Sequence, residues 1–322
     1  MKPSVSVMMV CYNSAPTLPW AFGSLLAQTW RDWECIFVDD GSTDRSYDVA
    51  VGLGDSRIRA FRLGTNRGRG AARQFALEQA EGDYLCILDA DDWMYPCRLR
   101  TELDFLEAEP KAALVSAGMA VLDGGVDLAG VRGHVYGDNP QVFPAITRLR
   151  MPPFPFPPSM IRTRIAKLCR FDPRLQVAED VDFLTQIILH HGYGILNQIV
   201  YSYTEYSTVT LQQLIAGSRF TRQMFGKQRA RFPLQSRLCN LKVFAKSLVY
   251  RGAFAINRSE WLIRRRSRPP TLTEEAEFYR ARATVALQVE DILETLVSPD
   301  KNLLFTAESL GLHSSNLREA AK

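Results

Sequence analysis

The stretch YLCILDADDWMYP at residues 84–96 decides the fold. Its first five residues are apolar and have the length of a buried strand. Asp89, Asp91 and Asp92 follow within four positions, and a tryptophan and a proline come soon after. We therefore predict a strand that ends abruptly in three carboxylates.

Strand and helix patterns alternate on both sides of this stretch. The predicted strands are Val5–Val10, Cys35–Val38, Ile58–Phe61 and Tyr84–Leu88, and the predicted helices lie at 18–26, 43–53, 68–80 and 96–106, with Ser42 or Thr43 as a cap of the second. Such alternation is typical of βαβ units with right-handed crossovers. We predict an α/β fold with a mixed, mostly parallel sheet flanked by helices.

Polar residues follow several of these strands directly. Because ligands bind beyond the carboxyl ends of such strands, we expect a common site there. Its members are Asn13, Asp39, Asp40, Asp89 and Asp91.

The later chain is less regular. We expect a strand at 113–117, a long loop or hairpin at 123–139, a helix opened by Glu179 and Asp180, a last strand at 195–203 and helices beyond about 209. The segment MPPFPFPPS at 151–159 has five prolines in seven residues. It is either a stiff extended connector or a rigid aromatic wall beside a site.

Composition excludes several classes of protein. No apolar run approaches the roughly 20 residues that span a bilayer, and the first apolar run is interpreted as a strand and not as a signal peptide. The six cysteines are scattered without a CxxC pair, which argues against zinc and disulfide frameworks and favours a reducing, cytosolic compartment.

The carboxylates have more than one interpretation. Asp89, Asp91 and Asp92 could form a solvated turn with one helix cap, or two of them could bind Mg²⁺ or Mn²⁺ together with substrate phosphates. We expect Asp92 to be structural, as a cap that holds the turn. Asp39 and Asp40 could form a turn or accept hydrogen bonds from a base or a ribose.

Two further motifs are equally open. NRGRGAAR at 66–73 is typical of a phosphate-binding glycine loop or of close packing of a helix on a sheet. Glu179 and Asp180 suit the positive end of a helix dipole, or a general base that reaches a sugar hydroxyl.

Together these motifs resemble family 2 glycosyltransferases with the GT-A fold. The matching pieces are VSVMMVCYNSAPTL at 5–18, SLLAQTWRDWECIFVDDGSTD at 24–44, NRGRGAAR at 66–73, EGDYLCILDADDWMYP at 81–96 and PSMIRTRIAKLCRFDPRLQVAEDVDF at 158–183. The resemblance implies a Rossmann-like catalytic domain at 1–208, with a nucleotide-sugar-binding half at 1–117 and an acceptor-binding half at 118–208. A helical basic extension would follow at 209–322.

The same resemblance implies an inverting, metal-dependent transfer from a nucleotide-sugar donor, such as a UDP-sugar, to a glycan or lipid-linked acceptor in bacterial surface polysaccharide synthesis. Asp180, with Glu179, would be catalytic, and Asp91 and Asp89 would bind the metal. The implied nucleotide-sugar-binding residues are Val10, Tyr12, Asn13, Asp39, Asp40, Arg69, Arg73, Asp89 and Ala90. A sugar nucleotidyltransferase and a nucleotide-sugar-binding protein without transfer activity are the alternatives.

Charge divides the chain. Residues 219–268 carry a balance of +13, between segments of −5 and −4. This block could be a solvated helical surface, or it could bind an anionic membrane at the inner face of the cell. We expect no nucleic-acid partner, since no known module is present. Members of the family often carry a basic residue after the last strand, and Arg219 or Arg222 could replace it here.

Overall fold

The structure is a computed structural model that describes residues 2–124, 127–133, 140–205 and 210–297. Its strands are β1 (Val5–Cys11), β2 (Trp33–Asp39), β3 (Ile58–Arg62), β4 (Tyr84–Ile87), β5 (Trp93–Met94), β6 (Ala112–Asp123), β7 (Asp127–Arg132), β8 (Gln141–Phe143), β9 (Ser159–Arg162) and β10 (Gly192–Thr204). Its helices are α1 (Leu18–Leu26), α2 (Ser46–Gly52), α3 (Arg69–Gln79), α4 (Arg98–Ala108), α5 (Thr163–Ala166), α6 (Glu179–Ile188), α7 (Leu211–Lys227), α8 (Pro233–Ala255), α9 (Ser259–Arg264) and α10 (Leu272–Val297).

One sheet of ten strands organises the described residues, and its main path runs β3-β2-β1-β4-β9-β6-β10-β5. The pairs β1–β2, β1–β4, β2–β3 and β6–β10 are parallel, whereas β9 runs antiparallel to both of its neighbours. The predicted mixed, mostly parallel sheet is confirmed. The sequence pattern did not reveal β9, because this four-residue strand directly follows the proline run.

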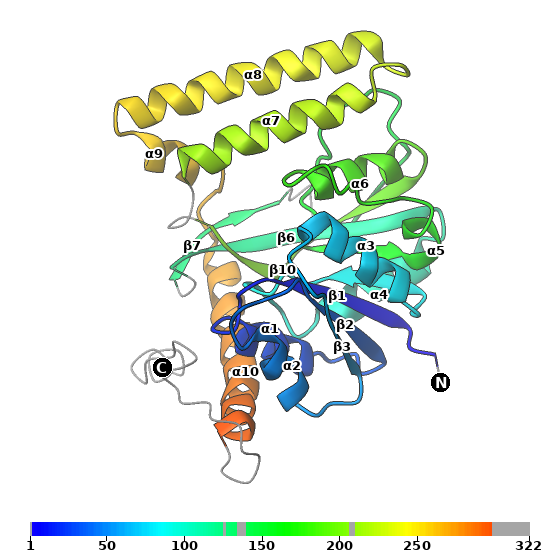
Figure 1. The fold of residues 1–322 in the computed structure, drawn as a ribbon, viewed down its shortest axis with the longest axis vertical. Helices are drawn as coiled ribbons and strands as arrows, with labels where there is room; N and C mark the ends of the chain where they lie inside the picture. The colour runs from blue at the N-terminus through cyan, green and yellow to red at the C-terminus, as the bar shows by residue number, and fades with distance from the viewer. Residues whose placement is uncertain (1, 125–126, 134–139, 206–209, 298–322) are drawn as a thin grey trace.

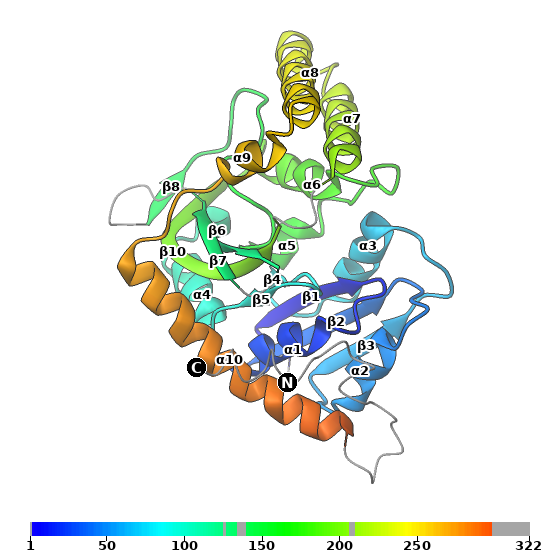
Figure 2. The ribbon, with the colours of Figure 1, turned by 90° about the vertical axis from the view of Figure 1, so that its left-hand side faces the viewer.

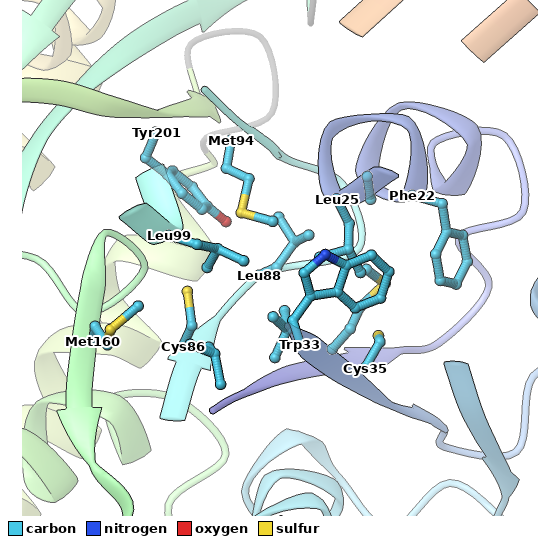
Figure 3. Packing of buried hydrophobic residues seen from close by; sticks show 14 of the residues in the cluster. Phe22, Leu25, Trp33, Cys35, Cys86, Leu88, Met94, Leu99, Met160 and Tyr201 are labelled. Carbon is cyan, nitrogen blue, oxygen red and sulfur yellow. The ribbon is translucent and has the colours of Figure 1, made fainter. Parts of the chain in front are cut away.

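The central strands are buried on both faces, as parallel strands covered by helices must be. All seven residues of β2 are buried. Helices α1, α2, α4 and α10 contribute to one core, where Phe22, Leu25, Trp33 and Leu99 pack together (Figure 3). Helices α3 and α6 contribute to the core on the other face.

The predicted cap of α2 is wrong. The helix begins at Ser46, and neither Ser42 nor Thr43 precedes it directly. Asp44 is the residue that organises this start, since its Oδ1 accepts hydrogen bonds from both the backbone and the hydroxyl of Ser46, at 3.0 and 2.6 Å. A carboxylate thus replaces the hydroxyl that the sequence led us to expect.

The helices after β10 go to two different places. Helices α7 and α8 form a hairpin at the top of Figure 1, whereas α10 returns along the body of the molecule. Figure 2 shows α10 crossing beside α1. The two helices pack so closely that a Cβ added to Gly23 of α1 would lie 2.8 Å from a side-chain carbon of Val289 on α10. The sequence predicted these helices but not the packing of α10 on the first helix of the chain.

None of the helices in the described part combines the length and the apolar composition that crossing a bilayer requires.

Gly82 gives a test of the packing between the α3–β4 connection and β1. A Cβ at this position would lie 2.5 Å from the backbone nitrogen of Ser6. We expect Gly82→Ala to lower the free energy of unfolding by about 1–3 kcal/mol, because backbone atoms cannot move aside cheaply. Urea denaturation measures the change.

Gly64→Ala is the matched control, because a Cβ at Gly64 has no neighbour within 4 Å. If Gly82→Ala and Gly64→Ala were equally stable, the close contact between residue 82 and the backbone of β1 would be contradicted.

Candidate active site

The turn after β4 is fixed by a buried carboxylate. Asp92 is 2% exposed, and it accepts hydrogen bonds from the Tyr201 hydroxyl at 2.9 Å and from the backbone of Thr204 at 3.1 Å. The same hydroxyl accepts from the backbone of Asp89 at 3.1 Å. The Tyr201 ring lies beside Met94 (Figure 3).

The expectation that Asp92 has a structural role and holds the turn is therefore confirmed, but the expectation that it caps the next helix is wrong. Cys97 is the N-cap of α4, while Asp92 joins the turn to β10, a strand more than a hundred residues away in sequence. Burial raises the pKa of Asp92, and the charges of Asp91 and Asp89 raise it further.

A buried arginine joins this turn to α6. Arg73 is 1% exposed and donates from Nη2 to Asp89 Oδ1 at 2.7 Å and from Nη1 to Glu179 Oε1 at 2.8 Å. Its guanidinium carbon lies 4.9 Å from the ring centre of Phe156. Arg73 thus connects α3, the turn at 89–92 (the aspartate turn), α6 and the proline run.

Glu179 and Asp180 have different surroundings. Glu179 is 2% exposed and also pairs with Arg69 Nε at 3.2 Å, so its carboxylate lies within the wall of the site. Asp180 is partly exposed, and its Oδ1 accepts a hydrogen bond from the backbone of Val181 at 2.7 Å. Ala178, directly before them, has a left-handed backbone with φ of 68°. Such strain in a residue with a Cβ is concentrated at functional sites.

The aspartates after β2 mainly hold loops. Asp39 is fully buried and accepts from the backbone of Ser42 at 2.9 Å. Asp40 accepts from the backbones of Arg67 and Gly68 at 2.9 and 2.8 Å, which ties this turn to the start of α3.

Asn13 also braces these turns. It adopts a left-handed backbone with φ of 53°, and its side-chain oxygen accepts from the backbone of Thr43 at 2.8 Å. We expect Asn13 and Asp39 to position the binding surface, since hydrogen bonds within the protein already engage both.

Most of the predicted nucleotide-sugar-binding residues meet in one cavity of about 320 Å³, which we call the rim cavity. Its lining residues are Val10, Cys11, Tyr12, Ser14, Asp40, Asn66, Gly68, Arg69, Ala72, Asp89, Ala90, Asp91 and Gln176. Tyr12 is 47% exposed there, which leaves its ring open to a ligand. Gly68 of the 66–73 motif lines this cavity. An added Cβ at Gly70 would come within 3.3 Å of the Asp172 carbonyl, so α3 packs closely at this point against the loop before α6, and not against the sheet as one interpretation predicted.

A second cavity of about 360 Å³ adjoins the first, and we call it the proline-lined cavity. Its lining residues are Arg69, Arg73, Asp89, Asp91, Met119, Arg132, Met151, Pro152, Phe154, Pro155, Phe156, Pro157, Asp180, Val181, Leu184, Tyr203, Glu205 and Arg266. The proline run is therefore an aromatic wall beside a site, as the second of its two interpretations predicted. Arg69, Asp89 and Asp91 line both cavities.

Two arginines that sequence reasoning missed lie in the proline-lined cavity. Arg132 on β7 and Arg266 after α9 both form ion pairs with Glu205, the second at 2.8 Å. Arg219 and Arg222 line a separate groove between α7 and α8, so the expectation that either serves this site is not supported. No sequence pattern could have selected Arg132 and Arg266, because chain folding alone brings them together.

Asp89 and Asp91, the carboxylates that line both cavities, would supply only some of the ligands of a divalent cation. No cluster of three or more side chains suited to a metal lies within the described residues. Burial by the surrounding site and the nearby charge of Asp89 raise the pKa of Asp91. A cation would relieve that repulsion. Since Mg²⁺ commonly takes one or two carboxylates and completes its shell with phosphate oxygens, Asp89 and Asp91 fit such an ion in the company of a phosphate ligand.

Replacement of Arg73 tests the buried connection. We expect Arg73→Lys to lower the free energy of unfolding by about 3 kcal/mol, because one ammonium group cannot span two carboxylates and leaves a buried charge poorly paired. Chemical denaturation measures this change.

Arg174→Lys is the control, since Arg174 also pairs bidentately with a carboxylate, Asp172, but its side chain is 81% exposed. We expect Arg174→Lys to lower the free energy of unfolding by at most about 0.5 kcal/mol. Similar losses in both variants would contradict a special role for Arg73.

Comparison with known proteins identifies the family of this chain and the structures that share its fold. A sequence profile of glycosyl transferase family 2 matches residues 6–172. The E. coli UDP-Glc:alpha-D-GlcNAc-diphosphoundecaprenol beta-1,3-glucosyltransferase WfaP is 34% identical over 105 residues, which cover 33% of this chain and 42% of that protein. The matched segments span less than half the length of the curated relatives.

Solved structures share the fold over the whole chain. The S. aureus TarS fragment in complex with UDP-GlcNAc has a TM-score of 0.59 at 20% identity and covers 100% of this chain and 90% of its own. The mannosyltransferase PcManGT from Pyrobaculum calidifontis, in complex with GDP-Man and Mn²⁺, has a TM-score of 0.53 at 17% identity and covers 100% and 86%. Because the family profile covers more than half of the sequence, the chain belongs to glycosyl transferase family 2.

Proposed function

We propose that this chain transfers a sugar from a nucleotide-diphosphate sugar, a UDP-sugar, to the hydroxyl group of a glycan or lipid-linked acceptor, with inversion at the anomeric carbon. One observation carries the proposal. The rim cavity and the proline-lined cavity share Arg69, Asp89 and Asp91, while Asp180 lines only the second. A donor in the first cavity would present its diphosphate at the junction and its sugar to the second.

The rim cavity would hold the nucleotide. Tyr12 offers an exposed ring for the base. Asp40 lines the same cavity, where its oxygens already accept from the backbones of Arg67 and Gly68 and would take a further hydrogen bond from the nucleotide. Val10 and Ala90 would contribute apolar contact from the same wall. We expect Arg69, which is half exposed, to approach the phosphates.

Asp180 would act as the general base. It accepts the proton of the acceptor hydroxyl while that oxygen forms a bond to the anomeric carbon. On the opposite side the bond from this carbon to the diphosphate oxygen breaks, and the diphosphate leaves with the electron pair. Glu179 would position Arg73 and Arg69 beside this reaction, since its carboxylate is buried against both.

The leaving diphosphate needs positive charge near it. Asp91 and Asp89 would hold Mn²⁺ or Mg²⁺, which would supply electrophilic stabilisation of the leaving group when bound. Arg132 and Arg266 would add fixed positive charge in the proline-lined cavity, where the expected basic residue after β10 is absent and Glu205 stands instead.

The acceptor class comes from the relatives. WfaP is named for a lipid diphosphate acceptor, and TarS was solved with UDP-GlcNAc. By analogy we assign this chain to bacterial surface polysaccharide synthesis, with transfer of a hexose type of sugar at the cytoplasmic side of the membrane.

Replacement of Asp180 tests the catalytic step. We expect Asp180→Asn to reduce transfer about 10²–10⁴-fold while donor affinity stays within about twofold, because the amide cannot accept the proton. Release of UDP from a donor panel and a calorimetric titration with UDP give the two readouts. Undiminished transfer would remove Asp180 as the base.

Replacement of Asp91 tests the ion. We expect Asp91→Asn to abolish most of the gain in UDP affinity that Mn²⁺ gives to the unaltered protein, because one carboxylate of the pair is lost. Asp104→Asn serves as control, since Asp104 is an exposed partner of Arg100 on α4. An unchanged response to Mn²⁺ in the Asp91 variant would contradict the metal assignment.

A further inference from the structure

Helix α8 has a packed inner face and, on the opposite side, an exposed apolar face. Its inner face carries Ser236, Cys239, Val243, Ser247 and Tyr250, which recur three or four residues apart. On this face Ser236 Oγ donates to the Phe225 carbonyl at 2.6 Å, and Cys239 and Val243 pack against a core that includes Met224 and Phe225. This face explains how α8 is held on α7.

The outer face of α8 has a second apolar stripe. It consists of Leu234, Leu238, Leu241, Ala245, Leu248 and Ile256, at the same helical spacing but half a turn away from the inner face. The leucines and the isoleucine are 49–71% exposed. A solvated helix normally carries polar residues there, so a continuous apolar stripe indicates a surface that meets something apolar.

Basic residues flank this stripe. Arg237 and Arg251 lie on one side of it and Lys242 and Lys246 on the other, as the helical period places them. Residues 211–258 contain ten lysines and arginines and no acidic residue. A partner of this face must therefore be apolar in the middle and negatively charged at the edges.

A groove between α7 and α8 adds a site for anionic groups. The groove, of about 220 Å³, is lined by Ile215, Ser218, Arg219, Arg222, Phe244, Ser247, Leu248 and Arg251. Its three arginines form no ion pair with any carboxylate in the described part of the chain. Arg222 lies over the Phe244 ring, with its guanidinium carbon 5.5 Å from the ring centre. Three guanidinium groups without a carboxylate partner among the described residues, beside an apolar stripe, suit the phosphate of a lipid whose acyl chains lie along the helix.

We propose that the outer stripe of α8 and the arginine groove form one docking surface for an anionic phospholipid bilayer. The helix lies in the interface plane, with its leucines among the acyl chains and its basic residues at the phosphates. Figure 1 shows α8 as the outermost helix at the top of the molecule, so a flat surface can reach it without obstruction from the sheet.

The docking surface lies close in sequence to the proline-lined cavity, and its role in catalysis rests on the proposed function. The stripe ends at Ile256, and Trp261 on α9 is 54% exposed just after it. Five residues further, Arg266 lines the proline-lined cavity. Docking of α8 therefore brings the cavity near the membrane, where a lipid-linked acceptor would present its sugar.

Vesicle flotation of the purified full chain tests the docking. We expect the chain to float with vesicles of phosphatidylcholine and phosphatidylglycerol and to remain in the bottom fraction with vesicles of pure phosphatidylcholine. Raising the salt concentration should release it from the anionic vesicles. Leu238→Glu with Leu241→Glu should weaken binding by roughly tenfold or more. Arg219→Gln with Arg222→Gln and Arg251→Gln should weaken it by roughly a hundredfold, at about fivefold for each charge.

The matched control is Leu168→Glu with Leu287→Glu, which adds the same charge at leucines that are 75% and 63% exposed, one in the turn after α5 and one on α10. This control should float like the unaltered chain, and thermal melts with UDP establish that every variant is folded. Equal recovery with neutral vesicles, or normal flotation of the α8 leucine variant, would overturn the proposal. So would a dimer in lipid-free solution that the α8 leucine variant converts to monomer.

Different variants test the membrane docking and the sugar transfer, so one proposal can be contradicted without the other. Asp180→Asn should float as the unaltered chain does, although its sugar transfer is strongly reduced. The α8 leucine variant should still release UDP from a donor in solution.

Discussion

The guanidinium of Arg73 holds a carboxylate on each side in a place that water hardly reaches. Asp89 and Glu179 come from segments far apart in sequence, and neither can move without leaving a charge unpaired in the interior. A buried ion pair is weak support for stability, because desolvation offsets much of the attraction. We infer that its main contribution is geometric: it fixes the aspartate turn against α6, so that Asp91 and Asp180 keep their separation.

The same constraint explains the strained backbone beside the site. Ala178 adopts a left-handed conformation that costs on the order of 1–2 kcal/mol in a residue with a Cβ. This conformation turns the chain so that α6 begins with Glu179 directed to Arg73. The neighbouring Asp180 is then left on the cavity side, and one local distortion gives two adjacent carboxylates opposite surroundings.

The sequence predicted what local rules govern. The parallel sheet followed from alternating strand and helix patterns, and Asp40, Asp89 and Asp91 could be placed at one rim because carboxyl ends of parallel strands share an edge. The sequence pattern also indicated a structural role for Asp92, which the hydrogen bond from the Tyr201 hydroxyl bears out. It did not show that Asp39 holds the protein together, because that role depends on the hydrogen bond from the backbone of Ser42. Strand β9, the packing of α10 and the positions of Arg132 and Arg266 depend on contacts between distant segments, which no local pattern records.

The basic block at residues 219–268 illustrates the difference between composition and arrangement. Its charge balance left both a solvated surface and a membrane surface open. The structure separates its residues into groups: Lys227 pairs with Asp172 and Asp182 and ties α7 to the catalytic body, whereas Arg219, Arg222 and Arg251 surround a groove. A merely solvated helix would have no reason to keep an apolar stripe opposite the face that already packs on α7. A packed face and an exposed apolar face on one helix imply two partners, and only one of them is within the described protein.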